Sequence, residues 1–83
     1  MQTVSVENVV LDILENITGT RQVRENLDIA LFDEHILDSF DMMLVIIELS
    51  DALHIEISPA EVERDAWSTP RKIIANVQTR IAG

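Results

Sequence analysis

The segment from Ser39 to Leu53 constrains the fold more than any other part of this chain. It contains neither Gly nor Pro and consists largely of good helix formers, which predicts one continuous helix. Asp38 precedes the segment as an N-cap, and Asp41 lies in the first turn, where the helix dipole favours a negative charge. Apolar side chains occupy nearly every side of this helix, so a single buried face does not hide them all.

These apolar side chains divide into two groups. Val45, Leu49 and Leu53 follow the spacing i, i+4, i+8 and suit a helical core. The second group, which we call the apolar stripe, consists of Phe40, Met43, Leu44 and Ile47. Two interpretations remain open. Either the helix is packed centrally and buries the stripe, or the stripe is exposed and docks partner proteins, since flexible Met side chains and apolar patches often mark such surfaces.

The first half of the chain predicts one more helix and a long loop. Residues 6–17 place their apolar side chains on one helical face, with Ser5 as N-cap and Gly19 suited to a left-handed helix end. Residues 19–38 keep neither a helical nor a strand period, which predicts an ordered loop. A loop of about 20 residues is unusual in so small a domain and indicates either a function or an undetected helical turn.

Two helix-start signals organise the C-terminal part. The run Ser58-Pro59-Ala60-Glu61 matches a capping box and predicts a short helix from about Pro59 to Arg64. Thr69 followed by Pro70 predicts a last helix that ends by Gly83. The apolar face of this last helix consists of Ile73, Ile74, Val77 and Ile81. We therefore predict an all-α, four-helix bundle in one domain, residues 1–83, with a long first loop and a short third helix.

Length and charge exclude several classes of function. A chain of 83 residues with 47% apolar residues forms one core and leaves no room for a deep, water-excluding active site. Its net charge of −9 repels phosphate backbones and anionic lipid headgroups, so nucleic acid is not an expected partner. The same charge attracts proteins that carry basic patches, which are the expected partners.

The residue inventory supports neither a disulfide framework nor a metal site. The chain has no Cys, and His35 and His54 stand nineteen positions apart without a ligand-spaced His partner. No apolar run approaches about 18 residues and the N-terminus lacks a basic region before an apolar one, so we expect no membrane span and a cytoplasmic location.

Ser39 is the candidate functional residue, because a negatively charged substituent is favoured at a helix start. By position alone, however, a Ser at such a place is usually only an N-cap. A serine nucleophile assisted by His35 and Asp38 is disfavoured, since the chain shows no Gly-x-Ser-x-Gly turn and little volume for a pocket. We predict no catalytic residue and a protein that is not an enzyme.

The run Leu37-Asp38-Ser39-Phe40, at the start of an apolar helix in an acidic helical chain, resembles the acyl and peptidyl carrier proteins over essentially the whole sequence. These proteins carry 4′-phosphopantetheine as a phosphodiester on the Ser of an Asp-Ser motif. The resemblance implies that this group is attached to Ser39, with Asp38 completing the motif. The terminal thiol of the group would supply the sulfur that a chain without Cys lacks.

A narrower resemblance follows the third predicted helix. The run from Arg64 to Ile73 is similar to the Arg-x-x-Trp-x-Thr-Pro-x-Lys-Ile signature of the D-alanyl carrier proteins, and Leu31-Phe32-Asp33-Glu34 is similar to their Leu-Phe-Glu run. Two positions depart from that family. His35 stands where Gly is common, which stiffens the loop, and Leu44 stands where a polar residue is common.

This resemblance implies a set of partners and a route. A phosphopantetheinyl transferase modifies Ser39, a D-alanine adenylating ligase loads D-alanine as a thioester, and a membrane-bound acyltransferase receives it for lipoteichoic acid. Docking uses the apolar stripe, and we expect a monomer. Two alternatives remain: a carrier of another aminoacyl or acyl group in a biosynthetic assembly line, and a helical protein-interaction module without a prosthetic group.

Overall fold

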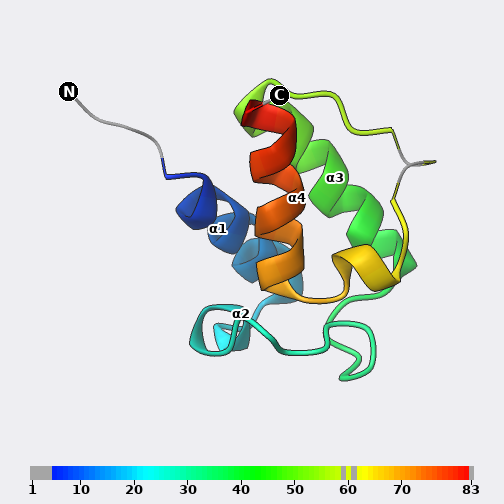
Figure 1. Ribbon diagram of the computed structural model, residues 1–83. Helices are drawn as coiled ribbons and strands as arrows, with labels where there is room; N and C mark the ends of the chain where they lie inside the picture. The colour runs from blue at the N-terminus through cyan, green and yellow to red at the C-terminus, as the bar shows by residue number, and fades with distance from the viewer. Residues whose placement is uncertain (1–4, 59, 61, 83) are drawn as a thin grey trace.

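The computed structural model describes residues 5–58, 60 and 62–82. Four α-helices follow one another along the chain, together with the 3₁₀ turn η2 (Figure 1): α1 Val6–Thr18, α2 Gln22–Glu25, α3 Ser39–Leu53, η2 Asp65–Trp67 and α4 Pro70–Ala82. All the regular secondary structure of the described residues is helical, which confirms the predicted all-α class. Within the described residues, every helix is too short or too polar to cross a lipid bilayer.

The ends of the long helices follow from local capping. The Ser5 hydroxyl accepts a hydrogen bond from the Asn8 backbone N–H at 3.3 Å, and Gly19 takes the left-handed conformation at φ 74°. The Thr69 hydroxyl accepts from the Lys72 backbone N–H at 3.1 Å at the start of α4. These caps satisfy backbone groups that a helix end leaves without partners, which is why the sequence predicted these boundaries well.

The core lies between α1, α3 and α4. Helix α1 packs against both of the other long helices, and in the view of Figure 1 α4 runs between α1 and α3. Trp67 is 1% exposed and lies among the side chains of this core. Ile81, which we predicted on the buried face of α4, is instead 44% exposed, because it lies in the last turn, beyond the packed part of the helix.

Two predictions about short elements need correction. The long loop contains the undetected turn that its length suggested, because Gln22–Glu25 forms α2. The third helix does not extend to Arg64: Ala60 has 3₁₀ geometry, but Val62 and Glu63 lie in irregular backbone, and the next turn is Asp65–Trp67. Trp67 is 1% exposed and anchors the Asp65–Trp67 turn in the core, while the Ser58 hydroxyl of the capping motif accepts a hydrogen bond from the Ala60 backbone N–H at 3.3 Å. Pro59 and Glu61 of that motif, and the predicted helix end at Gly83, lie outside the described residues.

The long loop is attached to the segment before α4. The Leu31 backbone N–H donates to the Ser68 carbonyl at 2.9 Å, and the Arg71 backbone N–H donates to the Leu27 carbonyl at 2.9 Å. The Arg71 side chain also donates to the Asp28 carboxylate at 2.7 Å. These contacts link residues more than 35 positions apart, so the loop is ordered by the C-terminal part of the chain.

Acid should weaken the Asp28–Arg71 contact. The hydrogen bond from Arg71 holds the pKa of Asp28 below its ordinary value. A carboxyl group whose pKa is lower in the folded than in the unfolded protein stabilises the fold. This stabilisation is fully present above the unfolded pKa of about 3.9 and is lost as pH falls through the folded pKa. We expect Asp28→Asn to lower the melting temperature at pH 7 and to lose this effect in acid, as pH falls below the ordinary pKa of the carboxyl group and through its lowered folded value.

Thermal melts across this pH range measure the effect. Asp33→Asn is the matched control, because Asp33 lies in the same loop, is exposed and has no ion pair among the described residues. A difference between Asp28→Asn and wild type that stays constant with pH contradicts the prediction.

Candidate functional site

Ser39 is the first residue of α3, and the residue before it, Asp38, is the N-cap of this helix. The Asp38 carboxylate accepts a hydrogen bond from the Asp41 backbone N–H at 2.8 Å. Ser39 is exposed, and among the described residues its hydroxyl has no hydrogen-bond partner. The interpretation of Ser39 as an ordinary N-cap is therefore wrong. The hydroxyl is free for a substituent at the positive end of the helix dipole.

A tight turn in the long loop leads directly into the start of α3. Leu31 and Leu37 are buried at 0% and 2% exposure, and the Leu37 backbone N–H donates to the Leu31 carbonyl at 3.0 Å. Between them, His35 takes a left-handed conformation at φ 57°. This backbone explains why Gly is the common residue at this position in the family that the sequence resembles, since Gly adopts positive φ without steric cost.

Substitutions at His35 test this conformation. His tolerates the left-handed region better than most residues, whereas a β-branched side chain there is strained. We expect His35→Val to lower the free energy of unfolding by about 1–2 kcal/mol and His35→Gly to leave it unchanged or to raise it by about 0.5 kcal/mol. Urea denaturation measures both variants. Glu34→Val is the control at a neighbouring residue without positive φ, and an equal loss in both Val variants contradicts a conformational cause.

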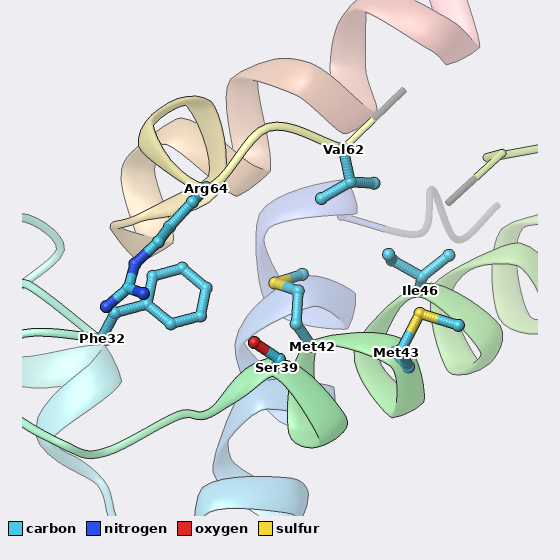
Figure 2. A pocket seen from close by; sticks show the side chains of 7 residues that line it. All are labelled: Phe32, Ser39, Met42, Met43, Ile46, Val62 and Arg64. Carbon is cyan, nitrogen blue, oxygen red and sulfur yellow. The ribbon is translucent and has the colours of Figure 1, made fainter. Parts of the chain in front are cut away.

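Two pockets share Ser39 in their walls. The first has a volume of about 180 Å³ and is mainly apolar, with the lining shown in Figure 2: Phe32, Ser39, Met42, Met43, Ile46, Val62 and Arg64. The second has a volume of about 350 Å³ and is more polar, with a lining of Phe32, His35, Leu37, Asp38, Ser39, Asp41 and Arg64. The segment before η2 and the long loop thus form, with the start of α3, a hollow around the Ser39 hydroxyl.

The walls of the second pocket carry charged side chains of both signs. Asp38 and Asp41 supply two carboxylates, and the Arg64 guanidinium lies 4.7 Å from the centroid of the Phe32 ring. His35 lines the same pocket as Ser39, but no hydrogen bond joins the two in the described part of the chain. A serine nucleophile needs such a base, and the described residues place none in hydrogen-bond contact with the Ser39 hydroxyl. The described residues also contain no group of three or more His, Asp or Glu side chains placed to hold a metal ion.

The apolar stripe lies on the solvent-facing side of α3. Its four side chains are exposed by 71% at Phe40, 42% at Met43, 37% at Leu44 and 60% at Ile47. The core side of the same helix buries Val45 and Leu49 completely. Of the two interpretations of this helix, central burial of the stripe is therefore wrong.

Sequence reasoning missed Phe32, Val62 and Arg64 as parts of this site. Arg64 was named only as the end of a predicted helix and the start of a run that resembles a family signature, and nothing in its local sequence indicates that it shares a pocket with Ser39. The resemblance of Leu31-Phe32-Asp33-Glu34 to a family run was the one available signal for Phe32. Trp67, in contrast, is part of the core and lines neither pocket.

Comparison with known proteins gives a consistent result. Residues 8–77 match the family described as "Phosphopantetheine attachment site". The D-alanyl carrier protein of Lactococcus lactis subsp. cremoris (strain MG1363) is 45% identical over 71 residues, which cover 86% of this chain and 90% of that protein. The D-alanyl carrier protein of Bacillus mycoides (strain KBAB4) is 44% identical over 69 residues, which cover 83% and 87% of the two chains.

Proposed function

This chain belongs to the D-alanyl carrier proteins, a family with a phosphopantetheine attachment site, and on that premise we propose that Ser39 carries 4′-phosphopantetheine and that the loaded cargo is D-alanine. The thiol of the group supplies the sulfur on which the cargo is held as a thioester. The chain contributes a rigid attachment point and a surface that partner enzymes recognise, and it acts as a substrate of those enzymes rather than as a catalyst.

The observation that carries this proposal is the free, exposed hydroxyl of Ser39. Asp38 satisfies the capping requirement of α3, so substitution of the Ser39 hydroxyl costs no hydrogen bond within the described residues. The helix start favours the negative charge of a phosphodiester. The adjoining apolar pocket of about 180 Å³ accommodates carbon atoms next to the attachment point. The residues present therefore fit the group.

The proposed partners follow from the route of a carrier. A phosphopantetheinyl transferase attaches the group from coenzyme A, a D-alanine adenylating ligase loads it, and a membrane-bound acyltransferase passes D-alanine towards lipoteichoic acid. We place modification and loading in the cytoplasm, because adenylation consumes ATP. The net charge of −9 supports recognition by enzymes with basic surfaces and predicts that docking weakens as salt is raised.

Loading of the modified protein tests the cargo. The phosphopantetheinylated chain is incubated with ATP, a D-alanine adenylating ligase and either D-alanine or L-alanine, and intact mass is measured. We expect an added mass with D-alanine that hydroxylamine removes, as it removes thioesters. A fully modified chain that accepts only another amino acid or acyl group from its own ligase contradicts the D-alanine assignment and leaves the carrier role intact.

The apolar stripe is the proposed docking surface, and Phe40 is its most exposed member at 71%. We expect Phe40→Glu to raise the KM of the ligase for the carrier by about tenfold or more, since exposed aromatic anchors dominate many interfaces. The fold should be unchanged, because the side chain lies outside the core. Ile81→Glu is the matched control, as Ile81 is also exposed, at 44%, but lies on α4. Equal effects of the two variants argue against a local docking site.

A further inference from the structure

Arg64 is the one Lys or Arg residue in the walls of the two pockets that contain Ser39, as far as the described residues line them. The sequence has six Lys and Arg residues in total. Others are held by acceptors elsewhere: Arg24 by Asp12 and Glu15, Arg71 by Asp28, and Lys72 by the Asp65 carbonyl. A cation next to the attachment point is therefore specific to this position and does not follow from a generally basic surface.

The Arg64 guanidinium forms no ion pair with any carboxylate of the described residues. Its carbon lies 4.7 Å from the Phe32 ring centroid, and Figure 2 shows it over that ring. Among the described residues it forms no hydrogen bond and no ion pair. A guanidinium carries five N–H donors in a planar fork that matches phosphate oxygens. Stacking on a ring leaves these edge donors available, so Arg64 is held in place with its hydrogen-bonding capacity unused.

The negative charges around Ser39 favour a cation beside them. Asp38 and Asp41 line the same 350 Å³ pocket as Ser39 and Arg64. A phosphodiester on Ser39 places a further negative charge beside these two carboxylates, in a chain that already has a net charge of −9. These negative charges repel one another, and a cation beside them offsets the repulsion. Arg64 is the side chain that is placed to offset this repulsion.

We propose that Arg64 binds the phosphodiester on Ser39 and thereby positions the attached group over the apolar pocket. This inference rests on the proposed attachment at Ser39. Arg64 is a positioning residue: it orients the group and reacts with nothing. With the phosphate held at the Arg64 side, the carbon atoms that follow it lie against the apolar walls that Met42, Ile46 and Val62 provide. The Phe32 ring lies against the guanidinium on the side away from the phosphodiester.

A thermodynamic cycle with unmodified and modified protein measures this contact. The melting temperatures of both forms are determined for the wild type and for Arg64→Gln, and the change on modification is compared between them. We expect the change in melting temperature on modification to be about 2–5 °C more positive in the wild type than in Arg64→Gln. This difference corresponds to one exposed ion pair in a domain of this size. The difference should shrink in high salt. Because each variant is its own reference, a general loss of stability in Arg64→Gln cancels.

The matched control is Arg21→Gln, which removes the same charge from an exposed residue that lines neither pocket. It should retain the wild-type response to modification. A second readout needs no variant: the Arg64 Nε–H resonance and the Phe32 ring resonances of the wild type should shift on modification, whereas the Arg21 Nε–H resonance should not.

The outcomes separate this inference from the attachment itself. If intact mass shows no added group on Ser39, both the attachment site and the role of Arg64 are wrong. If Ser39 is modified but the melting-temperature changes of the wild type and Arg64→Gln are equal and the Arg64 resonances do not shift, only the role of Arg64 is overturned.

Discussion

Ser39→Ala should abolish the covalent addition of phosphopantetheine while the protein stays folded. The reason is that Ser39 supplies the only hydroxyl at the start of α3, next to both pockets, and Ala offers no oxygen for a phosphodiester. Folding should be unaffected within about 0.5 kcal/mol, because the side chain is exposed and Asp38 caps the helix. Intact mass after incubation with coenzyme A and a broad phosphopantetheinyl transferase measures the first effect, and thermal melts measure the second.

Ser58→Ala is the control for this experiment, since Ser58 is another exposed serine that lies outside both pockets. It should be modified at the wild-type rate. If Ser39→Ala gains the same mass, the attachment site is a residue other than Ser39. If neither the wild type nor any variant is modified, and Phe40→Glu still disrupts partner binding, the chain is a helical protein-interaction module and not a carrier.

Trp67→Ala should lower the free energy of unfolding by about 3–5 kcal/mol, which is a large part of the total for a domain of this size. Trp67 is 1% exposed and fills the space between η2 and α4, where truncation leaves a cavity. The loss extends to the site, because Leu31 of the long loop is hydrogen-bonded to Ser68, the residue that follows Trp67. We therefore expect weaker amide protection in the long loop as well.

Urea denaturation followed by circular dichroism measures this effect, since the chain has a single Trp and the variant loses its fluorescence signal. Phe40→Ala is the matched control, because it removes an aromatic ring that is 71% exposed and should cost less than about 0.5 kcal/mol. A loss below about 1 kcal/mol in Trp67→Ala means that the ring is not part of the cooperative core.

Most of the helical framework could be predicted from the sequence, because its signals are local. Asp38 before α3, Ser5 before α1 and Thr69 before α4 each satisfy backbone N–H groups within three residues. Such caps depend on neighbours in the chain and on little else. The Asp65–Trp67 turn was missed for the opposite reason, because tertiary contacts hold Trp67 in the core and no local signal indicates them.

The site divides in the same way. The position of Ser39 at a helix start followed from sequence, and resemblance to a family gave it a chemical role. The N-cap at Asp38 was predicted and is confirmed by the hydrogen bond from the Asp41 N–H. That the Ser39 hydroxyl has no partner among the described residues did not follow from the sequence, because it depends on which other segments lie beside the helix start. The left-handed backbone of His35 was equally hidden, since a single His carries no signal of positive φ.

The sequence by itself determined that Ser39 begins an apolar helix in a small acidic bundle, because helix formation and capping are decided by residues within one or two turns. Only the tertiary structure decided which apolar side chains of α3 remain exposed and which cation faces Ser39. Arg64 lies 25 positions further along the chain and reaches the site because Trp67 and the Leu31–Ser68 hydrogen bond fold the C-terminal segment back onto the long loop.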